Sequence, residues 1–253
     1  MLKHRVIPAL LLRNDGLVKT HRFKSPQYIG DPLNAVRIFN DKEVDELMVL
    51  DMDASKTGAP PNFSIIEQLA GECFMPLCYG GGIRSLDDAS RIFALGIEKV
   101  CLQTAALADL SIVSRIAERY GQQSVVVSVD VKRDWLGKPK LYAAATSKTI
   151  NLSWQQFIQD AVAAGAGEIL LNTVDRDGTL KGPDLPLINA VSRSLPIPLI
   201  SLGGVSSLAD IKAAVEAGAT AVAAGAYFVL HGPHRAVLIT YPQYRDLEKL
   251  FAN

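Results

Sequence analysis

Two segments of the chain, residues 76–104 and 198–226, carry the same pattern at a constant separation of 122 positions and without a gap. Nine of the 29 aligned pairs are identical, and both segments contain a Gly-Gly pair, at 81–82 and at 203–204. The repeat indicates two equivalent halves, each of which ends a strand in a glycine turn that opens a helix. Because amide groups at the start of a helix attract anions, the two turns predict two similar anion-binding sites.

Eight short runs rich in Val, Ile and Leu alternate with helical patterns along the chain. Each run is nearly continuous in apolar residues, which is typical of parallel strands covered on both faces. With 253 residues, of which 49% are hydrophobic, the chain is long enough for one large α/β barrel or for two small domains. The predicted strands are residues 5–12, 46–52, 77–80, 99–104, 124–131, 168–174, 199–202 and 220–225.

Helix start signals lie between the predicted strands, in the form of a serine followed three residues later by an acidic residue or glutamine. Eight strands alternating with helices, together with the twofold repeat, predict a (β/α)8 TIM barrel of two half-barrels, with residues 1–253 as a single domain. A doubly wound open sheet is the alternative, but it gives no reason for a half-chain repeat. The start signals are Ser85 with Asp88, Ser207 with Asp210 and Ser153 with Gln156.

The charge balance and the spacing of cysteine and histidine argue against several classes of site. Lys plus Arg and Asp plus Glu number 26 each, without a long run of one sign, so no footprint for nucleic acid or membrane is evident. Three cysteines without a CxxC spacing and four histidines without a helical pair predict no metal site, and we expect no cofactor. The N-terminal apolar stretch is too short for a membrane span and lacks a cleavage site, which predicts a soluble cytoplasmic protein.

In a barrel of this type the reactive groups lie at the C-terminal ends of the strands. Glycines followed by a capped helix leave backbone N–H groups open to a ligand, which suits phosphate. Two such ends in equivalent places predict an elongated substrate, phosphorylated at both ends, that spans the barrel mouth. The candidate phosphate-binding residues at these ends are Gly81, Gly82, Gln103, Thr104, Gly203, Gly204, Gly225 and Ala226, and Leu11, Asp51, Asp130, Asp177 and Gly178 end the other strands.

Asp130 ends the Val-rich run VVVSVD, where its carboxylate points into the predicted mouth. A partly desolvated carboxylate there suits a general acid or base, and a cap for a nearby N–H group is the structural alternative. The repeat places its counterpart near position 11, which is Leu11 within an apolar run. A mechanism with two carboxylates therefore lacks one of them at the expected position.

Four charged residues begin predicted strands at the opposite end of the barrel: Arg5, Glu46, Lys99 and Glu168. Two positive and two negative side chains around one rim could close the bottom as a ring of ion pairs. From the residues alone, ordinary solvated charges at strand starts are the favoured interpretation, with the barrel as a packed core.

The connection from residue 13 to 32 is long and polar and contains Lys19, Arg22 and Lys24. A long loop at the catalytic end of a barrel is often a lid, and a surface excursion is the alternative.

Together these motifs resemble the HisF family, the cyclase subunit of imidazole glycerol phosphate synthase. The resemblance runs nearly end to end, through KHRVIPALLL, DELMVLDMDAS, GGGIRS, VVVSVDVKR and GAGEILLNTVDRDGT. It implies a HisH-like glutaminase subunit that docks on the bottom face and releases ammonia. Ammonia would pass a charged gate and the barrel core and react at the top with a bisphosphorylated ribulosyl-imidazolecarboxamide intermediate.

The resemblance also implies roles for individual residues. The family's gate falls on Arg5, Glu46, Lys99 and Glu168, all present, which reverses the interpretation of the rim as solvated charges. Lys19 matches a lysine of the mobile catalytic loop. The phosphate loops fall on Gly82, Thr104, Asp177, Gly178, Gly203, Gly204, Gly225 and Ala226.

The departures from the family pattern are specific. Of the family's two catalytic aspartates, Asp130 matches one and Leu11 replaces the other, and a leucine cannot transfer a proton. Gln103 stands in place of Asn, and Asp53 in place of Thr. Such changes resemble a paralogous branch found with surface-polysaccharide genes, the WbuZ-like proteins. There the barrel and its glutaminase are thought to deliver ammonia to a separate sugar amidotransferase that makes an acetamidino sugar.

Three hypotheses follow from this resemblance. The first is a HisF-like barrel that passes ammonia from a glutaminase to the amidation of a surface-polysaccharide sugar. The second is a cyclase of histidine biosynthesis in which Asp51 or Asp15 compensates for Leu11. The third is a scaffold that conducts ammonia without chemistry of its own. A sugar-phosphate isomerase is disfavoured by the charged rim and by Leu11.

Overall fold

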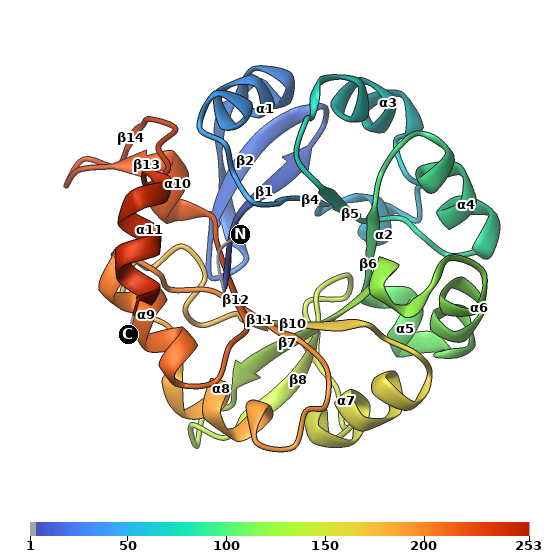
Figure 1. Ribbon diagram of the computed structural model, residues 1–253. Helices are drawn as coiled ribbons and strands as arrows, with labels where there is room; N and C mark the ends of the chain where they lie inside the picture. Colours follow the sequence, from blue (N-terminus) through green and yellow to red (C-terminus); the bar gives the residue numbers. More distant parts are fainter. Residues whose placement is uncertain (1–3, 253) are drawn as a thin grey trace.

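The computed structural model describes residues 4–252, and within this range eight parallel strands close into a ring surrounded by helices (Figure 1). Around the ring the order is β1, β4, β5, β6, β7, β10, β11 and β12, which returns to β1. This confirms the predicted (β/α)8 TIM barrel. The ring strands are β1 (Arg5–Arg13), β4 (Leu47–Asp51), β5 (Leu77–Gly80), β6 (Lys99–Leu102), β7 (Val125–Arg133), β10 (Glu168–Thr173), β11 (Leu199–Leu202) and β12 (Ala221–Ala224).

Amphipathic helices cover the outside of the ring, with their apolar faces on the strands. The longer ones are α1 (Pro32–Asp41), α3 (Phe63–Glu72), α4 (Leu86–Ala94), α6 (Ser111–Tyr120), α7 (Trp154–Ala163), α8 (Leu185–Ser192), α9 (Leu208–Glu216) and α11 (Tyr244–Phe251). Short turns of helix are α2 (Ala54–Thr57), α5 (Thr104–Ala108), η1 (Gln122–Ser124) and α10 (Ala226–Val229).

The predicted helix start signals are confirmed as N-caps. In each case the serine hydroxyl accepts the backbone N–H three residues later, which satisfies one of the free donors at the helix start. These hydrogen bonds begin α4 and α9 at equivalent positions of the repeat, and one of them begins α7. They run from Asp88 to Ser85 (3.1 Å), from Asp210 to Ser207 (3.2 Å) and from Gln156 to Ser153 (3.3 Å).

Antiparallel hairpins extend the ring at its mouth. The long polar connection after β1 contains β2 (Gly16–His21) and β3 (Lys24–Gly30), and β2 continues the sheet from the end of β1. Asn14 and Asp15 both have positive φ, 47° and 61°, as a two-residue hairpin turn requires. In the same way β8 (Pro139–Ala143), which pairs with β9 (Lys148–Thr149), continues the sheet from β7. A separate two-stranded sheet is formed by β13 (Leu230–His231) and β14 (Ala236–Val237).

The predicted strand 99–104 was wrong over its last two residues. The backbone N–H of Leu107 donates to the carbonyl of Gln103 at 2.8 Å, so the chain turns into α5 at Thr104. Gly225 precedes α10 in the same way, one half-barrel later. Both residues therefore present their backbone at the mouth instead of continuing a strand.

Small and branched apolar side chains fill the middle of the barrel and separate its two ends. Each of these residues is at most 5% exposed, so the central layer is close-packed. Alanines and cysteines make up half of the layer, so many of its side chains are small. The residues are Ile7, Ala9, Met48, Cys78, Cys101, Val126, Leu170, Ile200, Ala221 and Ala223.

Candidate active site

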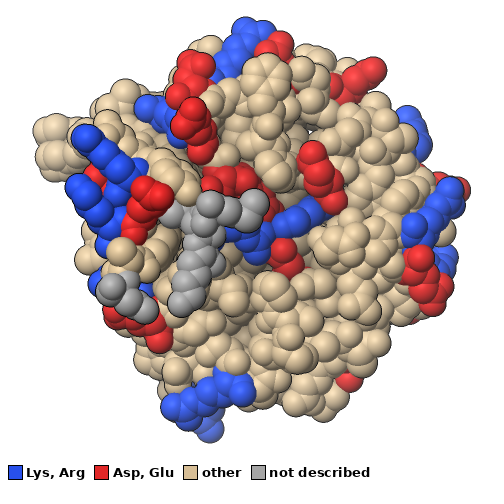
Figure 2. Space-filling view, viewed as in Figure 1, with Lys and Arg blue, Asp and Glu red and all other residues tan. Residues whose placement is uncertain are grey.

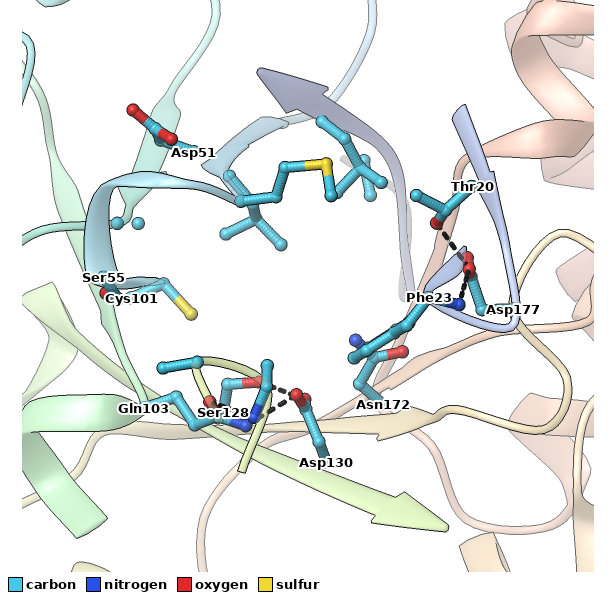
Figure 3. Close-up of a pocket in the computed structure, with 18 of the residues that line it drawn as sticks. Thr20, Phe23, Asp51, Ser55, Cys101, Gln103, Ser128, Asp130, Asn172 and Asp177 are labelled. Carbon is cyan, nitrogen blue, oxygen red and sulfur yellow. Dashed lines mark hydrogen bonds between the residues drawn. The ribbon is translucent and has the colours of Figure 1, made fainter. Parts of the chain in front are cut away.

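A hollow of about 150 Å³, here called the mouth pocket, opens at the C-terminal ends of the ring strands. In Figure 3 the polar side chains of Gln103, Ser128, Asp130 and Asn172 lie along one side of it. Residues from both halves of the chain meet there, as the strand-end argument predicts. The predicted site residues that line the pocket are Leu11, Lys19, Asp51, Gly81, Gln103, Thr104, Asp130, Asp177 and Gly225.

Asp130 is almost completely buried at the floor of the mouth pocket, with 4% of its surface exposed. Burial raises the pKa of its carboxyl group to about 7, although hydrogen bonds from Ser128 and Gln103 act in the opposite direction. Ser128 Oγ donates to Oδ1 at 3.0 Å and Gln103 Nε2 to Oδ2 at 2.6 Å (Figure 3). A carboxyl group with a pKa near neutral pH suits proton transfer in either direction.

Gln103 ties Asp130 to the hairpin that follows β7. Its Nε2 donates both to Asp130 and, at 3.2 Å, to the carbonyl of Tyr142, and its Oε1 accepts the N–H of Ala144 at 3.3 Å. The amide is therefore held at both ends. Its position in the structure orients Asp130, and phosphate binding by Gln103 stays a prediction.

Leu11 lies directly across the ring from Asp130, because β1 and β7 are four strands apart in either direction. In the parallel register, β1 pairs Leu11 with Leu50, and β7 pairs Asp130 with Asn172. Leu50 and Asn172 are themselves 122 positions apart. The register thus makes Leu11 and Asp130 equivalent in the two half-barrels, and the loss of a catalytic carboxylate at Leu11 remains a prediction from the resemblance.

The β2–β3 hairpin is clamped to the pocket through Asp177. The ammonium group of Lys19 forms an ion pair with this carboxylate, and both side chains are buried. Thr20 Oγ1 donates to the same carboxylate at 2.6 Å, and the backbone N–H of Phe23 also donates to it, at 3.1 Å (Figure 3). Asp177 therefore anchors the hairpin and neutralises Lys19, and its part in phosphate binding stays a prediction.

Two glycines make room for this clamp. A Cβ at Gly178 would lie 2.1 Å from the carbonyl oxygen of Thr20, and the φ of Gly178 is +65°. A Cβ at Gly225 would lie 3.2 Å from Cε of Lys19. Both positions need a small residue because the hairpin and its lysine pass against the backbone there.

The two glycine turns have matching backbones but different surroundings. Gly81 and Gly203 have φ of +124° and +116°, and Gly82 and Gly204 have +73° and +93°. The N–H of Gly82 points at Ser55 Oγ, 3.3 Å away, and Gly82 does not line the mouth pocket. The first turn is thus partly covered by α2.

The second turn borders a separate small cavity of about 10 Å³ beside the mouth pocket. Glycines and alanines make up six of its eleven lining residues, so a ligand could approach the backbone there, as phosphate binding favours. The structure brings together there the predicted residues Asp177, Gly178, Gly203, Gly204, Gly225 and Ala226, with Lys19 at its edge. Phosphate binding at either turn stays a prediction.

At the opposite end of the barrel the four predicted rim residues form a closed ring of ion pairs. Arg5 contacts both Glu46 and Glu168, and Lys99 Nζ lies 3.0 Å from Glu46 Oε2 and 2.9 Å from Glu168 Oε1. The two glutamates are 2% and 7% exposed. Figure 2 shows atoms of both charge signs meeting near the centre of this face. The interpretation of the rim as solvated charges was wrong.

The two carboxylates proposed to compensate for Leu11 have other partners. Asp51 Oδ1 accepts the N–H groups of Asp53 and Ala54, each at 3.0 Å, and so caps α2. Asp15 accepts from Asn62 Nδ2 at 2.7 Å and does not line the mouth pocket. Asp51 borders the pocket and remains a candidate auxiliary residue, whereas Asp15 is placed away from it.

Sequence reasoning missed Ser128 and Asn172, which line the mouth pocket beside Asp130. Ser128 precedes Asp130 by two residues, so the alternation of a strand puts both on one face. Asn172 lies on β10 and faces Asp130 only through the register of that pair. The first could have been found from periodicity, and the second needed the pairing of strands.

Among residues 4–252, no group of three or more His, Cys, Asp or Glu side chains is arranged to hold a metal ion. No helix in this range is long and apolar enough to cross a membrane.

Comparison with known proteins gives a consistent result. Residues 5–233 match the family described as "Histidine biosynthesis protein". The chain is 49% identical to a Pseudomonas aeruginosa protein named "Putative imidazole glycerol phosphate synthase subunit hisF2", over 98% of this chain and 99% of the relative. It is 48% identical to a Leptospira borgpetersenii protein named "Putative imidazole glycerol phosphate synthase subunit HisF", over 99% and 100%. A Hyphomonas neptunium protein named "Imidazole glycerol phosphate synthase subunit HisF" is 38% identical over 90% of each.

Proposed function

Because the chain belongs to the histidine biosynthesis protein family and is HisF-like, we propose that it is the lyase or cyclase-type synthase subunit of a glutamine amidotransferase. A glutaminase subunit would dock on the face that carries the ring of ion pairs and release ammonia there. The observation that carries this proposal is the closed ring of Arg5, Glu46, Lys99 and Glu168 at one end of a barrel whose other end holds Asp130.

The two ends suit successive steps of one reaction. The ion pairs would gate the entry of ammonia, which would pass the central layer, where alanines and cysteines limit the bulk of the side chains. In the mouth pocket Asp130 would take a proton from the attacking nitrogen or give one to the leaving group. Gln103 and Ser128 hold its carboxyl group in place for this step.

We further propose that the acceptor of ammonia is a sugar intermediate of surface-polysaccharide synthesis, amidated together with a separate sugar amidotransferase. Support comes from Leu11, which stands across the ring from Asp130 and cannot transfer a proton. A cyclase of histidine biosynthesis is the second candidate, favoured by Asp51 at the edge of the same pocket.

One assay separates the two candidates. The purified protein is given the bisphosphorylated imidazolecarboxamide intermediate with excess ammonium salt, and imidazole glycerol phosphate is measured. Sugar amidation predicts no turnover, together with stimulation of the glutaminase in the reconstituted pair. Turnover that Asp130→Asn abolishes would show a working cyclase and sink the sugar proposal.

Leu11→Asp gives the assay a second arm. If only the carboxylate at position 11 separates this pocket from a cyclase, the variant should gain measurable formation of imidazole glycerol phosphate. If the variant folds, binds the intermediate and still forms no product, the pocket differs from a cyclase at more positions than this one.

A further inference from the structure

The two sides of the mouth pocket differ in chemistry although the repeat makes them structurally equivalent. On one side β7 and β10 pair Asp130 with Asn172, and on the other β1 and β4 pair Leu11 with Leu50. Leu50 and Asn172 are 122 positions apart, so each pair holds the same place in its half-barrel. The pocket therefore has a polar wall on β7 and β10 and an apolar wall on β1 and β4.

The apolar wall is continuous and its side chains are partly uncovered. Met52 lines the pocket beyond Leu50, and all three of Leu11, Leu50 and Met52 are half-buried. Gly80 leaves space for this wall, because a Cβ there would lie 2.8 Å from Cδ2 of Leu50. Hydrocarbon that is open to a concave pocket gains free energy when an apolar part of a ligand covers it.

The polar groups that border the apolar wall already have partners. Asp51 accepts two backbone N–H groups at the start of α2 through Oδ1, and its carboxylate points away from the middle of the pocket (Figure 3). Thr20 and Lys19 both bind the carboxylate of Asp177. A hydroxyl group of a ligand placed against Leu11 would therefore lose its water without gaining a hydrogen bond, which is unfavourable.

We infer that the ligand of the mouth pocket is a phosphomonoester with an apolar substituent, a methyl group or short run of methylenes, that packs on Leu11, Leu50 and Met52. Its reacting group lies on the side of Asp130, across the ring from the apolar wall. The inference rests on the proposed function in taking this pocket as the site of the ammonia acceptor. The apolar wall then selects against substrates that carry hydroxyl groups there.

A series of simple phosphates tests the wall in the full-length protein. Dissociation constants are measured by NMR titration for inorganic phosphate and for methyl, ethyl and n-propyl phosphate. Each buried methylene should tighten binding by about two- to fourfold. Glycerol 3-phosphate, which has hydroxyl groups on the same three-carbon frame, should bind about tenfold more weakly than n-propyl phosphate. Equal affinities across the series, or for this last pair, would overturn the inference.

Variants of the wall test whether these residues cause the dependence of affinity on the alkyl chain. The double change Leu11→Asp with Leu50→Asn copies the polar pair onto β1 and β4, and it should remove the gain per methylene and the penalty for glycerol 3-phosphate. Leu50→Thr is a milder second variant, which should reduce the gain in affinity per methylene by at least half. Leu136→Asn is the control, since Leu136 is 57% exposed on the turn between β7 and β8. A folded wall variant that keeps the wild-type series would also overturn the inference.

Stimulation of the glutaminase, measured on the same preparations, keeps the two proposals apart. A flat phosphate series with normal stimulation means that the inferred wall is wrong and the proposed function stands. A graded series without stimulation supports the apolar wall and counts against the proposed function.

Discussion

The two ends of the barrel contain the same repeat with opposite results. At the rim, Glu46 and Glu168 are 122 positions apart, and each contacts both Arg5 and Lys99. At the mouth, the equivalent positions hold Asp130 and Leu11. Each cation of the ring bridges two carboxylates, so the ring requires both glutamates. The side chains of a pocket wall are constrained only by the ligand that they contact. The rim therefore keeps its carboxylate in both halves, and the mouth combines one polar and one apolar half.

The largest expected effect lies on the polar half of the mouth. Asp130→Asn keeps the shape of the side chain but removes its proton, so synthase turnover should fall about 10²–10⁴-fold. Glutamine and ammonium salt should support the residual rate equally, since the change lies beyond the point where ammonia enters. Asp87→Asn, at an exposed residue of α4, is the matched control. A variant that loses only the glutamine-dependent rate would contradict the assignment of Asp130 to the mouth chemistry.

The same carboxyl group should make stability depend on pH. Burial raises the pKa of Asp130 to about 7, whereas an unfolded aspartate has a pKa of about 3.9. The folded state holds the proton more tightly than the unfolded state does. The contribution of the protonated carboxyl group to the free energy of unfolding is therefore complete below about pH 4 and is lost as the pH rises through about 7.

Asn does not titrate, so Asp130→Asn should gain stability relative to the wild type between pH 4 and pH 8, by at most about 4 kcal/mol. Urea unfolding of both proteins at several pH values measures the difference. A difference that stays constant with pH would mean that Asp130 is charged in the folded state throughout this range.

At the rim, Lys99→Ala should disrupt the ring of ion pairs and leave the reaction at Asp130 intact. It leaves two buried glutamates with Arg5 alone, which should lower the free energy of unfolding by roughly 3–5 kcal/mol. Glutamine-dependent turnover should fall more than ammonia-dependent turnover if the ring gates the barrel. Lys138→Ala, at an exposed lysine, provides the control. Equal losses with both nitrogen sources would argue against a gate.

The smallest effect is expected at the β2–β3 hairpin, which belongs to the mouth. Lys19→Met removes the cation from buried Asp177, which weakens the clamp by about 1–2 kcal/mol. Backbone amides of β2 and β3 should then exchange about tenfold faster in hydrogen exchange, with little change in the core strands. Lys24→Met, exposed on the same hairpin, should leave the exchange unchanged. Protection that survives in Lys19→Met would show that Thr20 and Phe23 hold the hairpin by themselves.

Local patterns predicted the strands 77–80 and 199–202 with their observed bounds, because each is a short run between a proline and a Gly-Gly turn. The strand at 99–104 was too long, since Gln103 precedes α5 without a side-chain cap hydrogen bond, so no local signal marks where this helix begins. The rim charges were interpreted wrongly from the residues alone, since nothing local distinguishes a solvated strand start from one that faces three other charges.

The sequence by itself determined the repeat, the barrel, the glycine turns and the place of Asp130, because each depends on spacing along one strand or between equivalent strands. Only the tertiary structure decided which side chains meet. Closure of the ring joins Arg5 and Lys99 to both glutamates, places Leu11 across from Asp130 and sets Lys19 against Asp177. These contacts connect residues far apart in sequence, and their geometry depends on strand register and on closure of the barrel, which no local pattern specifies.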